Sequence, residues 1–270
     1  MNQGLKILLV IFMVAISGGC WQAWSRPFVV AIDAGHGGKD IGCRGKLSRE
    51  KDITLDVALR FGKKITDAFG DSVKVVYTRT GDNFVSLDRR AGIANEADAD
   101  LFISIHVNSL DARTKGRQSV HGASVYTVGL HKTDANLAVA MRENSVIELE
   151  PDMTEVYQGF DPNQSESYII FELNQNVHLE QSLLMASMAQ EALVQHAGRA
   201  DKGVRQAGFL VLWATRMPAV LVELDFICNP AAEEFLSSQK GREKCAEALM
   251  KAFRNYRAHF ANTSLNSDVL

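Results

Sequence analysis

Two hydrophobic patterns alternate along the chain. Short runs rich in Val, Ile, Leu and Phe are separated by longer segments whose apolar residues recur every three or four positions. Runs of the first kind are typical of strands buried on both faces, and segments of the second kind are typical of helices packed on a sheet. The pattern predicts one α/β domain with a twisted, mostly parallel sheet of about six strands flanked by helices.

The predicted strands share a high content of β-branched and large apolar residues. They are residues 28–33, 73–79, 101–107, 123–128, 208–213 and 219–225. The clearest helices are predicted at residues 50–69, 87–96 and 242–260. The first of these repeats Ile53, Val57, Phe61 and Ile65 every four residues, as an amphipathic helix does.

The N-terminus carries an export signal. Residues 7–16 form an unbroken apolar run behind the single charge of Lys6. As a helix this run would be about 15 Å long, half of a hydrocarbon core, so residues 1–25 are predicted to be a signal peptide rather than a membrane span. Small residues at 15–17 and 23–25 offer two cleavage sites, and Cys20 offers lipid attachment as an alternative. We expect an exported protein of the periplasm or cell envelope, with membrane attachment only through a lipid on Cys20.

The connection between the predicted strands 123–128 and 208–213 is unusually long. It holds 79 residues (129–207), whereas most connections hold about two to six. Within it, residues 143–166 contain seven acidic residues and no Lys or Arg, and a helical pattern follows to about residue 196. We therefore expect a catalytic domain over residues 26–262 with a helical, acidic insertion at about 131–200, and a polar tail at 263–270.

Charge and cysteine content give no indication of a nucleic-acid-binding protein, a cysteine metal site or a disulfide scaffold. The 29 basic and 32 acidic residues give a formal charge of −3, which gives no reason to expect a nucleic-acid partner. Beyond Cys20, the cysteines Cys43, Cys228 and Cys245 show neither paired metal spacing nor a disulfide framework.

Two histidines follow predicted buried strands. His36 lies in the glycine-rich turn after strand 28–33, and His106 lies at the end of strand 101–107. Ligands collect at the carboxyl edge of parallel strands, so both rings are expected at one edge of the sheet. A catalytic zinc site uses three protein ligands, commonly two histidines and a carboxylate, and leaves a fourth position open.

Two glutamates complete a candidate hydrolytic site. Glu50 opens the helix that follows the His36 turn and is the candidate third ligand; a role confined to the helix dipole is the alternative. Glu223 interrupts the apolar run 219–225, where burial of an unpaired carboxylate costs several kcal/mol. It suits a general base, and a solvent-facing position on an edge strand is the alternative.

Six sequence blocks occur in order along the chain, and they include all four of these residues. They are residues 30–38, 49–52, 77–82, 87–90, 99–108 and 217–230. In these blocks the chain resembles the zinc-dependent N-acetylmuramoyl-L-alanine amidases of the Amidase_3 family. The resemblance implies that His36, Glu50 and His106 bind Zn²⁺ and that Glu223 is the catalytic glutamate. It also implies a twisted sheet flanked by helices and hydrolysis of the amide between N-acetylmuramic acid and L-alanine in peptidoglycan.

The insertion resembles an extra helical segment that some family members place across the groove. In those members an activator protein displaces the segment. The resemblance thus implies peptidoglycan and an activator protein as partners, and we expect a carboxylate of residues 143–166 at the open zinc position. Asp225, on the same predicted strand face as Glu223, is expected to raise the pKa of Glu223.

Two other functions stay open on the sequence. The same ligand set could serve a zinc peptidase or a deacetylase that acts on cell-wall material. A peptidoglycan-binding protein without activity is a third interpretation, although its mark would be a missing ligand or a missing Glu223, and neither is missing here.

Overall fold

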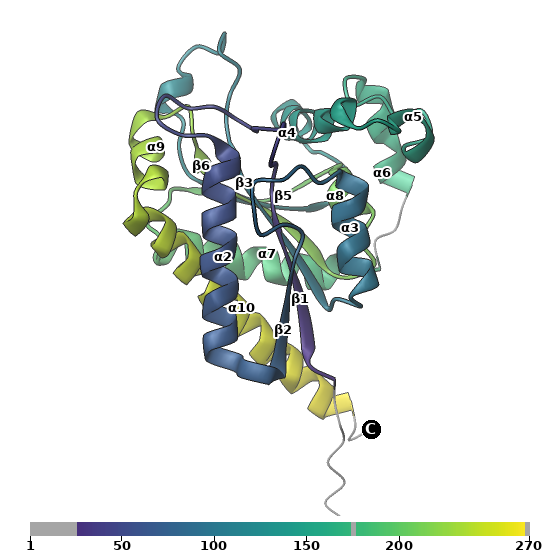
Figure 1. Ribbon diagram of the computed structural model, residues 1–270, viewed down its shortest axis with the longest axis vertical. Helices are drawn as coiled ribbons and strands as arrows, with labels where there is room; N and C mark the ends of the chain where they lie inside the picture. The colour runs from purple at the N-terminus through teal and green to yellow at the C-terminus, as the bar shows by residue number, and fades with distance from the viewer. Residues whose placement is uncertain (1–25, 174–176, 268–270) are drawn as a thin grey trace, which may run out of the picture.

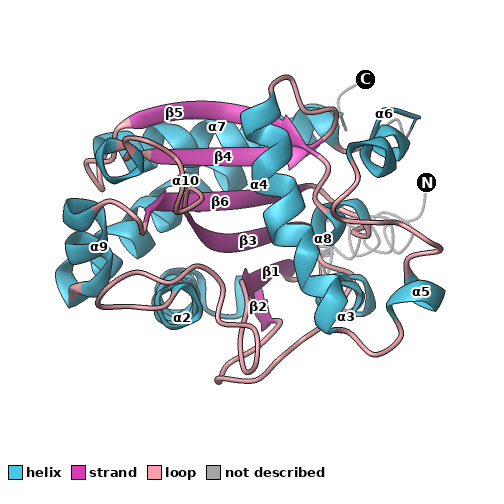
Figure 2. Ribbon diagram, turned by 90° about the horizontal axis from the view of Figure 1, so that it is seen from above, coloured by secondary structure: helices cyan, strands magenta, loops and turns pink. Residues whose placement is uncertain are grey.

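A six-stranded sheet forms the centre of the computed structural model, which describes residues 26–173 and 177–267 (Figures 1 and 2). The strands are β1 (Phe28–Ala34), β2 (Val73–Tyr77), β3 (Leu101–Asn108), β4 (Ala123–Val128), β5 (Asp201–Ala207) and β6 (Ala219–Phe226). Their order across the sheet is β2-β1-β3-β6-β4-β5, and every neighbouring pair is parallel except β4 with β6. The predicted α/β class with a mostly parallel sheet is confirmed.

Helices cover both faces of this sheet (Figure 1). They are α2 (Glu50–Phe69), α3 (Leu87–Glu96), α4 (Asp134–Asn144), α5 (Met153–Val156), α6 (Ile170–Leu173), α7 (Leu179–Gln195), α8 (Leu210–Trp213), α9 (Pro230–Ser237) and α10 (Gln239–Ser267). The core on one face is closed by α2, α7 and α10, and the core on the other face by α3, α4, α6 and α8.

Period-two alternation along the strands supplies both cores. In β1, Val30 and Ile32 pack in the core under α2, while Val29 and Ala31 pack in the core under α3. The four apolar residues that recur every four positions in α2 form the helix face that packs on the sheet, and their side chains are fully buried. The helices expected at residues 50–69 and 87–96 are found with those bounds.

The predicted strand at residues 208–213 is wrong. The edge strand β5 instead covers Asp201–Ala207. Its sequence, DKGVRQA, is mostly polar because the strand is only partly buried, so the apolar pattern does not reveal it. The apolar residues after it form α8, because the chain has passed the end of the sheet and turns into the second core. The side chain of Asn144 fixes this turn, since its Oδ1 accepts from the Leu210 amide at 3.0 Å and its Nδ2 donates to the Gly208 carbonyl at 2.7 Å.

The C-terminal helix is longer than predicted, and the predictions for the N-terminus fall on residues that the structure does not describe. Helix α10 continues to Ser267, beyond the end expected near residue 260 and into the expected polar tail. The expected signal peptide and the Cys20 lipid site lie outside the described residues. No helix within the described ranges combines the length and the apolar character that crossing a membrane requires.

A buried ion pair lies between β1 and α3, directly beneath the turn that carries His36. Asp33 is fully buried, and its carboxylate accepts from Arg90 Nη1 at 2.7 Å, Thr78 Oγ1 at 2.6 Å and Ser104 Oγ at 2.6 Å. Burial raises the pKa of Asp33, but Arg90 and the two hydroxyl donors outweigh it and lower that pKa to about 2. The strand therefore ends in a carboxylate that stays charged at neutral pH.

We expect an Asp33→Asn substitution to reduce the free energy of unfolding by about 3 kcal/mol at pH 7, because it leaves the Arg90 guanidinium buried without its counter-charge. A carboxylate whose pKa falls on folding stabilises the protein above its unfolded pKa of about 3.9, and this contribution is lost as the pH falls towards 2. The stability of the variant should thus fall less steeply between pH 5 and pH 2. Urea unfolding across this range measures both effects, with Asp67→Asn on the exposed side of α2 as the control. An equal loss in the two variants would contradict the prediction.

Candidate metal centre

The turn after β1 has an unusual backbone that presents His36. His36 has φ of 62°, and the two glycines that follow also have positive φ. Only glycine fits at position 35, because a Cβ there would lie 2.5 Å from Nε2 of His106. The glycines thus let the His36 and His106 rings approach to 4.8 Å between centroids.

Two buried arginines hold the carbonyl groups of this turn. Arg79 donates to the carbonyls of Ala34 and Gly35, both at 2.8 Å. Arg90 donates to the carbonyls of Ala34 and His36, both at 2.7 Å. These bonds satisfy three consecutive carbonyls at the end of β1, so the turn keeps its shape.

Glu50 is the first residue of α2 and is fully buried. Its Oε1 accepts from the Val107 amide at 2.7 Å, and its Oε2 accepts from the Cys43 amide at 2.8 Å. The carboxylate is therefore fixed against the end of β3, beside His106, as well as lying at a helix N-terminus. The role confined to the helix dipole does not account for these contacts.

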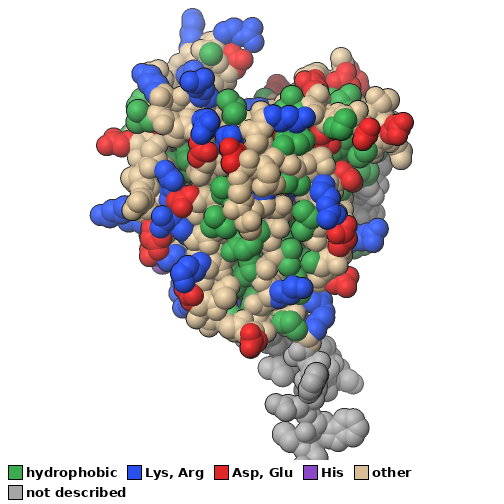
Figure 3. Space-filling view, in the orientation of Figure 1, with side chains coloured by type: hydrophobic (Ala, Val, Ile, Leu, Met, Phe, Trp, Pro, Cys, Tyr) green, Lys and Arg blue, Asp and Glu red, His purple; other side chains and the backbone are tan. Residues whose placement is uncertain are grey.

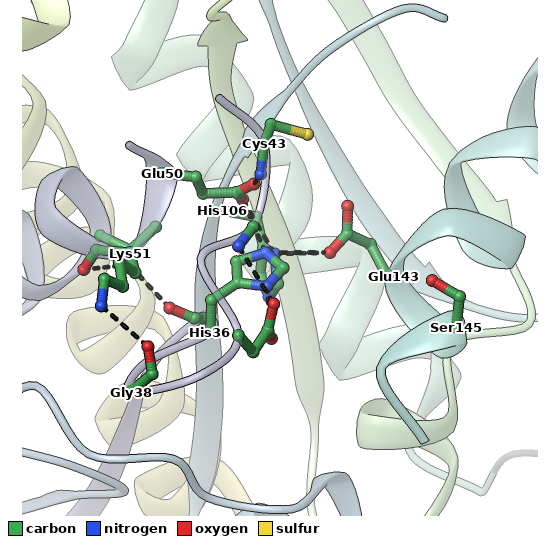
Figure 4. Close-up of polar contacts among 12 residues, drawn as sticks. His36, Gly38, Cys43, Glu50, Lys51, His106, Glu143 and Ser145 are labelled. Carbon is green, nitrogen blue, oxygen red and sulfur yellow. Dashed lines mark hydrogen bonds and ion pairs between the residues drawn. The ribbon is translucent and has the colours of Figure 1, made fainter. Parts of the chain in front are cut away.

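Four buried side chains from separate elements meet at one point (Figure 4). His36, Glu50 and His106 are joined there by Glu143 of α4, and one ligand atom from each lies within 4.8 Å of all the others. Nε2 of His36 lies 3.1 Å from Glu50 and 3.3 Å from Glu143, and Nδ1 of His106 lies 3.2 Å and 3.0 Å from the same carboxylates.

The atoms at the centre of this cluster fit a divalent cation. His36 Nε2, His106 Nδ1 and Glu143 Oε2 are all buried and lack a hydrogen-bond partner despite these short distances. Buried polar atoms without partners are rare, and an ion that they coordinate satisfies them together. Two imidazoles and a carboxylate are a common catalytic zinc set.

The carboxylates of the cluster favour a positive charge on both histidines. Burial lowers the pKa of His106, but Glu143 and Glu50 outweigh it and raise that pKa to about 9. The pKa of His36 is likewise raised well above its usual value by Glu50 and its other carboxylate neighbours, against the effect of burial. A bound cation would take over the position and the charge of these protons.

Asp40 was not identified from the sequence. Its Oδ2 lies 2.7 Å from Nδ1 of His36, so a proton on Nδ1 leaves Nε2 as the free donor atom that faces the cluster. Such a carboxylate commonly orients a metal-bound histidine. The only sequence signal was an aspartate four residues after His36 in the same glycine-rich loop.

Glu223 lies beside the cluster on a central strand. It pairs with His106 in the register of β3 and β6 and is fully buried, so the alternative of an exposed edge position is wrong. Its nearest charged partner is Arg142, with Nη2 3.4 Å from Oε1, while its Oε2 has no hydrogen-bond partner. Burial and the Glu143 carboxylate raise the pKa of Glu223 to about 8.

Asp225 does not play the part expected of it. Arg199 Nη1 lies 2.8 Å from its Oδ2, and the Gly122 amide donates to its Oδ1 at 2.6 Å. Its charge is compensated locally, and the carboxylates that raise the pKa of Glu223 are Glu143 and Glu50 instead. The prediction failed because Arg199 and Gly122 are distant from Asp225 in the sequence, so their contacts with it could not be foreseen.

Helix α4 closes one side of a cavity of about 280 Å³ at the cluster. His36 and Cys43 line it from one side, and Glu143, Val146 and Leu149 line it from the insertion. The expected acidic stretch therefore does reach the site, through its first carboxylate. Among the described residues no second group of His, Cys, Asp and Glu side chains is arranged to hold a metal ion.

We expect Gly35→Ala to weaken binding of a divalent metal at least tenfold, because the added Cβ displaces the His106 ring. Competition with a chromogenic chelator measures the affinity. Gly92→Ala is the matched control, since a Cβ there meets only the end of Arg89 at 3.7 Å inside α3. Equal affinity in the two variants would show that the close approach at Gly35 does not position the ring.

Comparison with known proteins agrees with this geometry. Residues 30–255 match the Amidase_3 family, described as N-acetylmuramoyl-L-alanine amidase. AmiC of Escherichia coli O6:H1 is 32% identical over 240 residues, which are 86% of this chain and 53% of that relative. AmiA of Escherichia coli K12 is 31% identical over 240 residues, which are 88% of this chain and 79% of that relative. The chain thus spans about half the length of the first relative.

A solved structure resembles the whole domain. The N-acetylmuramoyl-L-alanine amidase from Clostridium difficile 630 superposes with a TM-score of 0.64 and 25% identity, covering 87% of this chain and 98% of its own. The family match covers more than half of the chain and contains all four predicted site residues. This protein belongs to the N-acetylmuramoyl-L-alanine amidase family.

Proposed function

We propose that this protein hydrolyses the amide between N-acetylmuramic acid and the L-alanine of the peptidoglycan stem peptide, with a zinc ion held by His36, Glu50 and His106. One observation carries the proposal. The buried Nε2 of His36 and Nδ1 of His106 have no hydrogen-bond partner, and they lie beside the Glu50 carboxylate, with Glu223 buried next to them. Family membership supports the reaction and the substrate.

The three ligands have separate supports, as a preformed site requires. Asp40 orients His36, the Gly35 contact positions His106, and two backbone amides hold Glu50. A zinc ion held by these residues would polarise the substrate carbonyl and lower the pKa of the attacking water.

Glu223 moves the proton in this proposal. It accepts a proton from the attacking water, whose oxygen bonds to the lactyl carbonyl carbon. When the carbon–nitrogen bond breaks, the same carboxyl group returns the proton to the leaving nitrogen, so the products are a free lactyl carboxylate and the amine of L-alanine. The register of β3 and β6, in which Glu223 pairs with His106, supports this role.

We also propose that the described structure is a closed state, held by α4. Glu143 takes the place at the cluster that substrate or water needs, and Arg142 pairs with Glu223 and donates to the Ser109 carbonyl at 2.8 Å. Two adjacent residues of one helix thus engage the ligands and the base together. Displacement of α4, with the acidic insertion, by an activator protein would free both.

The cellular location belongs to the same proposal. Peptidoglycan lies outside the cytoplasmic membrane, so the substrate requires an exported chain, in agreement with the signal read from residues 1–25. Lipid attachment at Cys20 is the alternative to cleavage. A zinc peptidase or a deacetylase would use the same ligands, but would release different products.

Mass spectrometry of the soluble products from purified peptidoglycan tests the reaction. With zinc present we expect stem peptides that begin at L-alanine with a free amine, and sugars that keep their N-acetyl groups. Glu223→Gln is the control, and its rate should be lower by at least about a hundredfold because the base is lost. Peptides cleaved within the stem, or sugars without N-acetyl groups, would refute the amidase assignment.

We expect Glu143→Ala to increase the rate of peptidoglycan hydrolysis at least tenfold, because it frees the fourth position at the cluster. Dye release from labelled peptidoglycan measures the rate. The control is Glu155→Ala, which removes an exposed carboxylate of the same insertion. A rate that is unchanged or lower in Glu143→Ala, with zinc content equal to that of the parent protein, would exclude the closed state.

A further inference from the structure

Two loops next to the metal centre carry exposed basic side chains. Residues 41–49 lead from the His36 turn into α2, and residues 109–119 follow β3 directly after His106. Both loops rise from the carboxyl edge of the sheet on the side of α9 (Figure 1). Their basic residues, which we call the basic rim, are Arg44, Lys46, Arg49, Arg113, Lys115 and Arg117.

The backbone under the basic rim is fixed. Residues 44 and 49 form an antiparallel bridge, and the Glu233 carboxylate accepts from the amides of Leu47 at 2.6 Å and Ser48 at 3.0 Å. In the second loop, the thiol of Cys228 donates to the Arg117 carbonyl at 3.3 Å. Both loops are thus anchored beside α9 and hold their charges at a set place near the site.

Most of the rim charge is uncompensated. Arg49 pairs with Asp52 and Arg113 with Asp111, but no ion pair in the described part of the chain engages Arg44, Lys46 or Lys115. Residues 41–49 contain no acidic residue, and residues 109–119 contain only Asp111. Arg117 also has a buried Nε without a hydrogen-bond partner. Even with the Glu233 carboxylate bound to the first loop, the basic rim keeps a net positive charge, which attracts anions.

The insertion forms the opposite side of the cavity and is rich in acidic residues, with Arg142 as a basic residue among them. The acidic segment 143–166 lies there, and Glu148 lines the cavity across from Cys43 of the first loop. The space-filling view shows the same division, with basic side chains over the upper left, acidic ones over the upper right and a hollow between them (Figure 3). The cavity itself is lined by charges of both signs, Asp40 and Arg142 included, so the division of charge lies on the surface around it.

We propose that the basic rim binds free carboxylates of the stem peptide and so fixes the direction in which the substrate lies across the metal centre. This inference rests on the proposed amidase function. The two sides of the scissile amide differ in charge, because the muramic acid side has its lactyl carboxyl bound in the amide, whereas the peptide side keeps free carboxylates. The peptide lies towards residues 41–49 and 109–119, and the muramic acid side, which has no free carboxylate at the scissile amide, lies away from them.

Peptide binding tests the basic rim without any need for hydrolysis. The probes are a fluorescently labelled stem peptide with free carboxylates and the same peptide with its carboxylates amidated, each added to the full chain at low salt. The rim variant is Arg44→Gln/Lys46→Gln/Lys115→Gln. The matched control is Lys74→Gln/Lys251→Gln/Arg254→Gln, which removes three exposed charges on β2 and α10.

The parent and control proteins should bind the carboxylate peptide about tenfold more tightly than the amidated one. The rim variant should bind both peptides alike, since each exposed ion pair contributes up to a few-fold in affinity and three are removed. The preference should also shrink as salt rises to 0.3 M. A rim variant that keeps the full preference, or a control that loses it, overturns the proposal. Lys46→Glu, a single exposed reversal, repeats the test if the triple variant does not fold.

Hydrolysis kinetics separate this proposal from the proposed function. In a Glu143→Ala background, the rim changes should raise KM for a muramoyl peptide with free carboxylates about tenfold and alter kcat less than twofold. With the amidated substrate KM should not change. If no protein cleaves the amide while the peptide preference persists, the amidase assignment fails and the basic rim stands. If the amide is cleaved with equal KM in the rim and control variants, the proposal for the basic rim is refuted and the amidase assignment is not.

Discussion

The site depends on a buried ionic network under the turn that follows β1. Asp33, Arg79 and Arg90 lie out of solvent; the two arginines donate to the carbonyls of residues 34–36, and Asp33 accepts from Arg90. Charges are costly to bury, and the cost is offset here because each guanidinium has several acceptors and Asp33 has three donors. This network lets a non-glycine residue, His36, keep a left-handed backbone at the cluster.

Strand pattern made much of the fold predictable. Strands buried on both faces are continuous apolar runs, so five of the six were found from the sequence, and the repeat in α2 gave its bounds. Strand β5 was not found because it lies at the sheet edge and is mostly polar, and the apolar run after it packs as a helix in the second core. An apolar run in the sequence indicates that a segment is buried. It does not indicate whether the segment is a strand of the sheet or a helix packed against the sheet.

The site was predictable where it follows from strand ends. His36 and His106 end parallel neighbours, so their meeting is a consequence of topology. Glu143 was foreseen only as one carboxylate of an acidic stretch, and Arg142 was not foreseen, because α4 reaches the site through tertiary packing. Asn144, at the end of that helix, is an example. Its hydrogen-bond partners are Gly208 and Leu210, and no local sequence pattern predicts contacts between residues so far apart in the chain.

The position of β6 has a consequence for biosynthesis. This strand is the last in the chain, yet it lies in the middle of the sheet, between β3 and β4. Residues upstream of it therefore cannot close the sheet, and the anchor of the first basic loop, Glu233, comes later still. A chain that is still emerging from the ribosome lacks both Glu223 and the strand that joins β3 to β4. The candidate metal centre and Glu223 can therefore come together only after residues 219–226 have been synthesised.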